Sequence, residues 1–350
     1  MQRLPSESID LIYIDPPFFS NRHYEVIWGN GAELRAFGDR WKGGINVYVE
    51  WMRERLIEMH RLLKLTGSIY VHLDWHAVHY IKCEMDDIFG MGNFRNEISW
   101  CYSIGGRGKQ QWGRKHDSIL FYSKEEKFYF NVDEVRVPGK TGTYMRRGHD
   151  EKGREFLEKT DKKTSKVYRY YVDDGTIPPD YWTDIEQLNR EDAERLGYPT
   201  QKPEALLERI IKASSKKNQI VADFFCGVGT TLAVAERLGR RWIGCDVSPI
   251  ACKLARRRIS KVIKEERDIE IIGMPHDIDE LKTMEPFEFQ NHVIVDLLHG
   301  TCSRTKSADR GIDGHDFGHN PVEVKQSDGV GRPVVQKFHS AVLAERRNKG

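Results

Sequence analysis

A carboxylate followed by two prolines and an aromatic residue stands near the start of the chain, at Asp15-Pro16-Pro17-Phe18. The preceding run, Asp10 to Ile14, is short, mostly apolar and rich in β-branched residues, which is typical of a buried strand that the prolines must end. We therefore expect Asp15 at the carboxyl end of a core strand, where open α/β sheets bind ligands. Asp15 and the Pro16 carbonyl would offer two acceptors beside the flat face of Phe18, which suits a planar amine. A simple turn with an apolar anchor is the alternative.

A glycine-rich turn far downstream is a second candidate site. The apolar run Gln219–Phe225 predicts a strand that leads through Gly227 and Gly229 into a helix, and glycines there let the backbone approach a ligand closely. Asp246 ends the next expected strand, where a carboxylate can hold both hydroxyls of a ribose. The turn lacks the third glycine of a dinucleotide site and the lysine of a P-loop. It therefore indicates an adenosine-bearing ligand without a pyrophosphate, with packing alone as the alternative.

The elements that must position these residues alternate between strands and helices along most of the chain. This alternation predicts an α/β fold with a doubly wound, mostly parallel sheet. The expected helices are 46–64, 77–89, one from about Pro203, 232–238 and 249–264, and the further strands are 68–73, 96–102, 117–123, 241–245 and 269–272. The first helix is expected to stop at Thr66-Gly67.

The alternation fails between Asn131 and about Leu196. This segment is polar, charged and rich in tyrosine, and it is too long for an ordinary loop of a compact sheet. Its aromatic residues favour an ordered functional insert over disorder.

Charge is balanced over the whole chain but uneven along it. The formal net charge of the 350 residues is +2, so no global attraction to nucleic acid is indicated. Residues 131–171 nevertheless hold eleven Lys and Arg against seven Asp and Glu, and residues 104–115 hold basic residues without an acid, namely Arg107, Lys109, Arg114 and Lys115. Such stretches fit either a phosphate-contacting surface or solvated loops.

Cysteine usage and hydropathy predict a cytoplasmic protein that is not inserted in a membrane. The six cysteines are scattered and none forms a Cys-x-x-Cys pair, which argues against a zinc ribbon or a disulfide framework and favours a reducing compartment. No charged and apolar leader and no apolar run of membrane-spanning length is present.

The Asp-Pro-Pro-aromatic motif followed by the glycine motif resembles the S-adenosylmethionine-dependent amino-group DNA methyltransferases, in the subgroup with this motif order. The resemblance covers roughly residues 8–130 and 196–275 and implies a seven-stranded methyltransferase sheet, S-adenosylmethionine as cofactor and double-stranded DNA as substrate. A homodimer is compatible with it. It implies catalytic roles for Asp15, Pro16, Pro17 and Phe18, contacts to the methionine part of the cofactor from Asp223, Phe224, Cys226, Gly227, Gly229 and Thr230, a ribose contact from Asp246, and closure over the cofactor by Thr200, Lys202 and Pro203.

The resemblance also divides the chain. Residues 1–130 would form the catalytic half, 131–196 the target-recognition insert, and 197–275 the cofactor-binding half, while Arg107, Lys109, Arg114 and Lys115 would contact DNA. An aspartate before the proline pair favours adenine N6 as the target, although cytosine-N4 enzymes share this chemistry. A DNA-binding nuclease subunit whose methyltransferase fold is only a scaffold is the alternative from another class.

Residues 284–350 resemble part of an Mrr-like restriction-endonuclease core and would form a small α/β module. Asp313 and Glu323 could hold Mg²⁺, with Lys325 on the same strand face stabilising phosphate charge. An ordinary exposed strand is the alternative. Few residues follow Lys325, and the chain begins abruptly, so we expect an open-ended piece of a fused restriction-modification protein whose nuclease part is incomplete.

Overall fold

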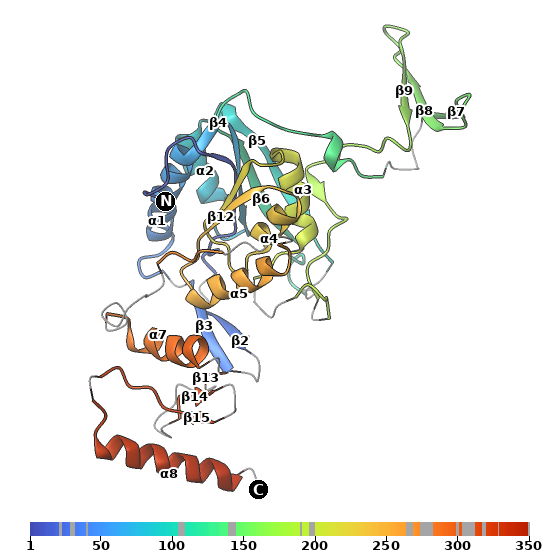
Figure 1. Ribbon diagram of the computed structural model, residues 1–350. Coiled ribbons are helices and arrows are strands. Elements are labelled where there is room, and N and C mark those ends of the chain that lie inside the picture. Colours follow the sequence, from blue (N-terminus) through green and yellow to red (C-terminus); the bar gives the residue numbers. More distant parts are fainter. Residues whose placement is uncertain are drawn as a thin grey trace.

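The computed structural model describes residues 1–20, 23–28, 32–39, 41–103, 109–138, 145–189, 191–195, 200–263, 269–273, 283–298, 301–302, 312–316, 320–327 and 329–348. A seven-stranded sheet forms its centre, in the order β10-β5-β6-β4-β1-β11-β12 (Figure 1). The strands are β1 (Ile9–Ile14), β4 (Leu63–Leu73), β5 (Phe94–Cys101), β6 (His116–Ser123), β10 (Tyr181–Trp182), β11 (Ile220–Asp223) and β12 (Arg241–Gly244). Only β6 runs antiparallel to its neighbours within this sheet, which confirms the predicted mostly parallel α/β fold.

Side chains of the central strand β1 alternate between two apolar layers. Ile12 and Ile14 pack with helices α1 (Ile45–Leu62) and α2 (Val78–Phe89), while Leu11 and Tyr13 pack with α3 (Glu204–Ser214) and α4 (Thr230–Arg237). Figure 1 shows these helix pairs on opposite sides of the sheet. Because both faces are covered, β1 is apolar at nearly every position, as parallel core strands are.

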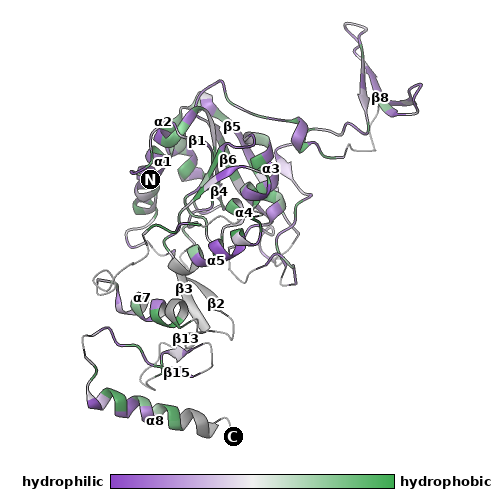
Figure 2. Ribbon diagram, viewed as in Figure 1, coloured by the Kyte–Doolittle hydropathy of each residue, from purple (hydrophilic) through white to green (hydrophobic). Residues whose placement is uncertain are grey.

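The remaining helix of the core is α5 (Pro249–Ser260), which begins directly after the carboxyl edge of the sheet. Its N-cap Ser248 accepts a hydrogen bond from the Ala251 amide at 3.4 Å, and Pro249 occupies the first turn, where its missing N–H costs nothing. Much of this helix is hydrophilic in Figure 2. One of its basic residues, Arg258, is buried.

Three local predictions differ from the structure. Helix α1 ends at Leu62 and the chain passes straight into β4, so Gly67 lies inside the strand, where a Cβ atom would be only 3.0 Å from the Asp10 carbonyl oxygen. Residues 269–272 form no strand; Ile269 instead packs beside Leu232 and Ile259. The hairpin β2 (His23–Trp28) and β3 (Ala32–Gly38) was not predicted.

The middle of the predicted insert forms a separate antiparallel sheet that projects from the body (Figure 1). Its strands are β7 (Arg146–His149), β8 (Glu155–Thr160) and β9 (Val167–Tyr171). A short 3₁₀ helix, η2 (Asp133–Val135), precedes it, and another, η1 (Met91–Asn93), follows α2. The end of the predicted insert returns to the body, where Trp182 of β10 is buried against the edge strand β5.

In the C-terminal part, the described residues form short strands and the helices α7 (Pro286–Asn291) and α8 (Arg332–Asn348). They also form the π-helical turn His292–Leu297, and the antiparallel strands are β13 (Thr301–Cys302), β14 (Gly314–His315) and β15 (Pro321–Val322). None of the helices that the structure describes combines the length and the apolar character needed to cross a bilayer.

Candidate active site

Three aspartates lie at the carboxyl ends of adjacent parallel strands. Asp15 follows β1, Asp223 ends β11, and Asp246 follows β12. The two motifs that are far apart in sequence therefore meet at one edge of the sheet, as their positions at strand ends predict.

The Asp15 carboxylate is largely buried and only half paired. Its Oδ2 atom accepts a hydrogen bond from the Lys202 ammonium at 2.5 Å, and the two side chains are 13% and 11% exposed. The Oδ1 atom is buried without a hydrogen-bond partner. Because an unpaired buried acceptor costs free energy, this oxygen is a vacant acceptor for a ligand donor.

The Phe18 ring contacts both Lys202 and a buried histidine. Lys202 Nζ is 5.2 Å from the ring centroid, and the His72 ring stacks on Phe18 at 6.0 Å with an interplanar angle of 21°. His72 is fixed in turn by the Tyr13 hydroxyl at 2.9 Å and by Asp117 Oδ2 at 3.2 Å. The Phe18 ring is therefore packed against a histidine whose position is fixed by two buried hydrogen bonds.

The loop that follows the proline pair is fastened by two residues. The buried Asp39 accepts hydrogen bonds from the backbone amides of Phe19 at 3.0 Å and Ser20 at 2.6 Å, while the Tyr48 hydroxyl donates to the Pro17 carbonyl at 2.7 Å. Within the described residues no donor reaches the Pro16 carbonyl. This carbonyl thus remains an acceptor next to Asp15, as predicted.

The glycine turn has the backbone shape that its sequence predicts. Gly227 and Gly229 have φ angles of 48° and 73°, in the left-handed region that favours glycine. A Cβ atom on Gly229 would lie 2.7 Å from the Ala255 Cβ atom, so α5 could not pack against a larger residue there. Asp246 accepts hydrogen bonds from the Gly227 and Ser248 amides, each at 2.8 Å, and thereby fixes the turn.

Asp223 supports the turn from inside. Its side chain accepts hydrogen bonds from the Thr231 hydroxyl at 2.6 Å and from the Phe225 amide at 3.0 Å. Burial raises the pKa of Asp223 to about 7, although the two hydrogen bonds lower it, and the negative charges of Asp15 and Asp246 make smaller contributions to the rise. Burial also raises the pKa of Asp246. Three carboxyl groups are therefore close together at this edge of the sheet, and a bound cation would stabilise their ionised forms.

Other residues of the predicted cofactor set pack inside the protein. The Phe224 ring belongs to the apolar layer of α1 and α2, and Cys226 packs with Leu232 and Ile259. Burial raises the pKa of the Cys226 thiol well above its usual range, which makes it an inert packing residue.

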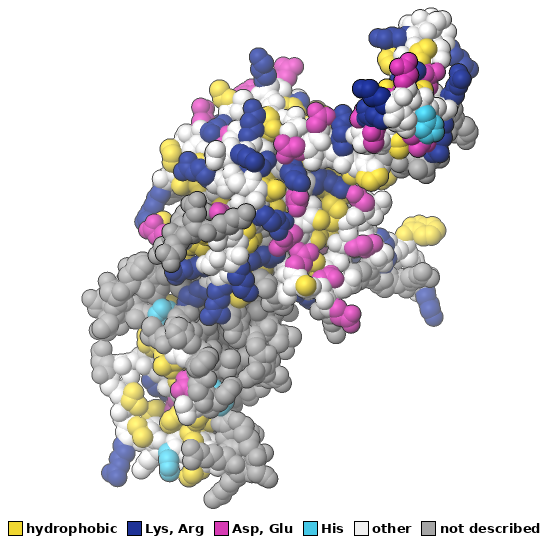
Figure 3. All heavy atoms as spheres, turned by 45° about the vertical axis from the view of Figure 1, so that its right-hand side comes forward, with side chains coloured by type: hydrophobic (Ala, Val, Ile, Leu, Met, Phe, Trp, Pro, Cys, Tyr) yellow, Lys and Arg dark blue, Asp and Glu magenta, His cyan; other side chains and the backbone are white. Residues whose placement is uncertain are grey.

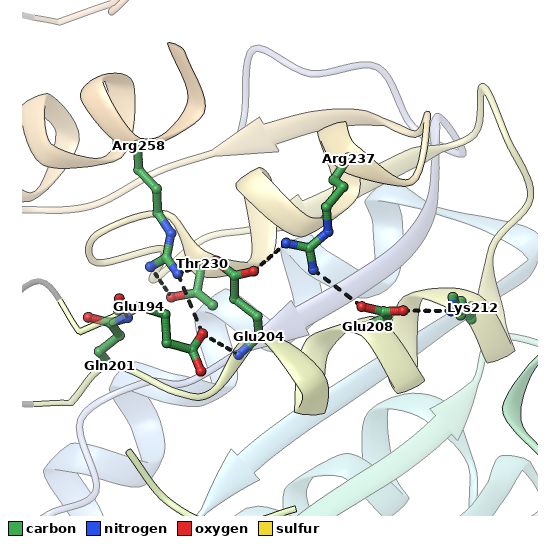
Figure 4. A network of polar contacts seen from close by, with 8 residues as sticks. All are labelled: Glu194, Gln201, Glu204, Glu208, Lys212, Thr230, Arg237 and Arg258. Carbon is green, nitrogen blue, oxygen red and sulfur yellow. Dashed lines mark hydrogen bonds and ion pairs between the residues drawn. The ribbon is translucent and has the colours of Figure 1, made fainter. Parts of the chain in front are cut away.

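A buried arginine joins the glycine turn to the segment that carries Lys202 (Figure 4). The Arg258 guanidinium donates to the Thr230 hydroxyl at 2.8 Å and to Glu204 Oε1 at 2.7 Å, and its side chain is 8% exposed. Glu194, at the end of the insert, accepts the Glu204 amide at 3.0 Å, and its carbonyl accepts from the Gln201 side chain at 2.6 Å. Arg258 thus connects α5, the cofactor turn and the start of α3.

The closing segment itself runs from Thr200 to Pro203. Thr200 is partly buried, Lys202 reaches Asp15, and the buried Pro203 caps α3, which begins one residue later than proline in the first turn would give. The contact between Lys202 and Asp15 was not predicted, because the residues are 187 positions apart and no local pattern signals their meeting.

Three of the four predicted DNA-contacting residues lie within the described part of the chain. The Arg114 guanidinium stacks 3.9 Å above the exposed Trp75 ring, Lys115 donates to the Ser103 carbonyl at 2.8 Å, and Lys109 is exposed. Arg107 lies outside the described residues. Trp112 is 95% exposed between these basic residues, and its exposure could not be read from its sequence position.

The expected Mg²⁺ site lacks support. Glu323 and Lys325 pair at 2.9 Å after β15 has ended, and Asp313 accepts from the Val324 amide at 2.7 Å. Across the described part of the chain, no three His, Cys, Asp or Glu side chains gather as a metal would require. The predicted strand placement of Glu323 and Lys325 is wrong, because β15 contains only Pro321 and Val322.

Sequence reasoning also missed Asp39, His72 and Arg258. Each acts through a contact to a distant segment, and none stands in a motif. An acid before Trp41 or a histidine inside an apolar strand would give a weak signal at most.

Comparison with known proteins places this geometry in a family. Residues 9–257 match the model of the N6/N4 DNA methylases, described as DNA methylase. The chain is 31% identical over 261 residues to DNA adenine methyltransferase YhdJ of Escherichia coli (strain K12), covering 74% of this chain and 79% of that protein. It is 32% identical to the type II methyltransferase M.HpaI of Haemophilus parainfluenzae, covering 74% of this chain and 70% of that protein.

A solved structure agrees with the fold. The cytosine-N4-specific PvuII DNA methyltransferase superposes with a TM-score of 0.50 and 18% identity, covering 76% of this chain and 84% of that one. The family match ends at residue 257, before the C-terminal module, and an Mrr-like relationship of that module is not shown. The chain belongs to the N6/N4 DNA methylase family, the S-adenosylmethionine-dependent methyltransferases that modify exocyclic amino groups of DNA bases.

Proposed function

We propose that this chain transfers the methyl group of S-adenosylmethionine to the N6 amine of an adenine flipped out of double-stranded DNA, as part of a restriction-modification system. The vacant Asp15 Oδ1 atom carries the proposal, because it is buried without a partner at the carboxyl end of β1. Lys202, which binds the other oxygen of Asp15, lies 5.2 Å from the centroid of the Phe18 ring. The relatives named as an adenine methyltransferase and as a type II methyltransferase support the substrate and the system.

The charge of the sheet edge suits this cofactor. S-adenosylmethionine carries a sulfonium and an ammonium, and Asp15, Asp223 and Asp246 supply carboxylates at neighbouring strand ends. The glycine turn permits close approach of the backbone, and Asp246 is placed to accept from ribose hydroxyls while it holds Gly227. The cofactor supplies an electrophilic methyl group on sulfur.

The protein residues prepare the amine. Flipping the base costs a few kcal/mol, and stacking on Phe18 would return about 1–3 kcal/mol. Hydrogen bonds from the two amine hydrogens to Asp15 and to the Pro16 carbonyl would favour a pyramidal nitrogen, whose lone pair is then free to attack the methyl carbon in line. Positioning of the reactants can contribute up to about 7–11 kcal/mol.

Asp15 need not be a strong base in this scheme. The nitrogen becomes acidic only after it has gained the methyl group, and it can then pass a proton to Asp15 or to water. A covalent cysteine mechanism would need a cysteine after the proline pair, where this chain has Phe18.

Adenine is favoured over cytosine by the aspartate at position 15 and by the adenine-methylating relative. Both bases present an exocyclic amine, so a cytosine-N4 activity is the second candidate, and the fold of the PvuII enzyme accommodates it. A homodimer stays a prediction.

The experiment is nucleoside analysis of DNA after incubation with the chain and S-adenosylmethionine. We expect N6-methyladenine; N4-methylcytosine instead would move the target to the second candidate. No methylated nucleoside, together with no thermal stabilisation by S-adenosylmethionine, would overturn the proposal and favour a methyltransferase fold that serves only as a scaffold.

A further inference from the structure

The projecting sheet of β7, β8 and β9 has two faces of different character. Residues opposite one another in the three strands share a face, and faces alternate along each strand. Arg146, Glu158 and Arg169 form one cross-strand row. The next row, Arg147, Leu157 and Tyr170, points to the opposite side.

One face, here called the covered face, is closed by its own side chains. The Phe156 ring lies over Gly148, where a Cβ atom would come within 2.7 Å of the ring, and Phe156 is 8% exposed. The Arg169 guanidinium lies 3.9 Å above Phe156, and Tyr171 meets its edge at 6.1 Å. Glu158 pairs with Arg169 at 3.2 Å. This face therefore forms a small core that holds the sheet together.

The opposite face, here called the open face, carries Arg147, His149, Glu155, Leu157, Lys159, Tyr168 and Tyr170. Tyr168 and Tyr170 are 40% and 52% exposed, and the Arg147 side chain is 51% exposed. Aromatic side chains exposed together on a sheet are uncommon in a protein without a partner for them.

The charge of the open face is positive around these rings. Lys159 stands opposite Tyr168, and Lys166 Nζ lies 5.2 Å from the Tyr168 ring centroid. Glu155 is the acid on this face among the described residues, and it pairs with Arg147 at 3.5 Å. Figure 3 shows Lys and Arg side chains on this projecting part of the molecule, interspersed with hydrophobic side chains and with Asp and Glu.

We propose that the open face is the surface with which the insert contacts duplex DNA beside the target base, while the covered face points away from the duplex. The inference rests on the proposed function and deepens it. Lysine and arginine would contact phosphates, and the tyrosine rings would contact sugars and base edges with their apolar bodies and hydroxyl tips. A β-ribbon fits the major groove, which is about 12 Å wide.

Two adjacent arginines allow a matched test. Arg146 and Arg147 are neighbours in β7, both exposed, and they project to opposite faces. We expect Arg147→Ala to raise the Kd for a fluorescein-labelled duplex of random sequence about five- to tenfold. The slope of log Kd against log salt concentration should fall by about one, because one phosphate contact is lost. Arg146→Ala should stay within about twofold of the parent chain. Equal or larger weakening by Arg146→Ala would overturn the assignment of faces.

The tyrosines give a second, independent readout. The double variant Tyr168→Ala and Tyr170→Ala should weaken duplex binding by about tenfold or more. A second double variant, Tyr168→Ala with Tyr170→Phe, should bind the duplex more tightly than the double alanine variant, because it keeps one aromatic ring on the open face. The Kd for S-adenosylmethionine should not change, since the sheet projects from the body that holds the cofactor edge. Circular dichroism of each variant checks that the sheet remains folded.

Failure of this inference can be separated from failure of the proposed function. If the parent chain methylates DNA but the open-face variants bind duplex like the parent, the face assignment is wrong and the methyltransferase function stands. If the parent chain binds duplex through the open face but yields no methylated nucleoside, the face assignment stands and the proposed reaction is wrong.

Discussion

The two ends of strand β1 each carry an aspartate paired with a lysine, and the two pairs differ in how completely they are satisfied. At the amino end, both Asp10 oxygens accept from Lys64 at 2.8 Å, and one also accepts the Ile220 amide at 2.9 Å. At the carboxyl end, Lys202 satisfies one oxygen of Asp15 and leaves the other buried and vacant. An unpaired buried acceptor costs about 1–3 kcal/mol, and the fold bears that cost at the edge where ligands bind.

The insert repeats this contrast between a satisfied and an open side. Its covered face closes over Phe156, whereas its open face leaves Tyr168 and Tyr170 exposed beside cations. In both regions, the groups that have partners within the protein hold the structure together. The groups without such partners indicate where a ligand or DNA would bind.

The largest effect should separate the two ends of β1. We expect Asp15→Ala to lower methyl transfer by about 10³-fold while cofactor binding persists, because the amine loses its acceptor. Asp10→Ala should instead lower the free energy of unfolding by about 1–3 kcal/mol and leave turnover per folded molecule unchanged. Formation of the demethylated cofactor and thermal unfolding measure the two quantities, and near-normal turnover by Asp15→Ala would break the comparison.

A smaller effect is expected from Arg258, which joins the glycine turn to the segment that carries Lys202. Arg258→Ala should lower kcat/KM for the cofactor roughly 10²-fold, because Thr230 and Glu204 lose their common partner and the segment bearing Lys202 shifts. Arg237 is the matched control, since it also binds Glu204 but does not contact the glycine turn. Arg237→Ala should stay within about threefold in steady-state kinetics. Equal losses in both variants would reduce Arg258 to a general stabilising role.

The ribose contact should matter for binding more than for chemistry. Asp246→Ala should weaken the Kd for S-adenosylmethionine by about 10- to 10²-fold, the value of a hydrogen-bonded charged acceptor, and calorimetry measures it. An unchanged Kd would remove Asp246 from the ribose role and leave it as a support of Gly227.

The smallest effect is a pH dependence of cofactor binding. Burial raises the pKa of Asp223 to about 7, so below that pH the carboxyl is largely protonated in the free protein. A bound cation favours the ionised form, so affinity should rise with pH up to about 7 and then level, by up to about tenfold between about pH 6 and about pH 8. Calorimetric Kd values should show this rise in the parent chain and lose it in Asp223→Asn; a rise that persists in the variant would assign it to another group.

The same raised pKa affects stability with the opposite sign. The folded-state pKa of Asp223 lies above the ordinary value of 3.8, so the folded protein binds more protons than the unfolded chain between these pH values. The contribution of Asp223 to the free energy of unfolding therefore falls as pH rises from about 4 to about 7. Urea unfolding of the parent chain and of Asp223→Asn across this range measures that contribution.

The sequence predicted every strand of the main sheet except β10. Apolar runs such as Ile9–Ile14 predict buried strands, and prolines and glycines mark where they end. The short strand β10 was not predictable, because a two-residue strand has no period and depends on the edge of β5. Strands β7 to β9 were missed because exposed strands carry few apolar residues.

The site was predictable only where a motif spans neighbouring residues. The motif formed by Asp15, Pro16 and Phe18 indicates its chemistry through the residue types and their spacing. Lys202, by contrast, meets Asp15 across 187 positions, and His72 supports Phe18 from another strand, so both contacts follow from the folded arrangement alone.

The central claim is that the edge of β1 performs the chemistry and that the open face of the insert provides binding. Single-turnover methyl transfer at saturating DNA and saturating S-adenosylmethionine tests it most directly, with Asp15→Ala and Arg147→Ala compared side by side. We predict that saturation restores the parent rate constant in Arg147→Ala and leaves Asp15→Ala about 10³-fold slower. A rate constant near that of the parent chain in Asp15→Ala would contradict the account.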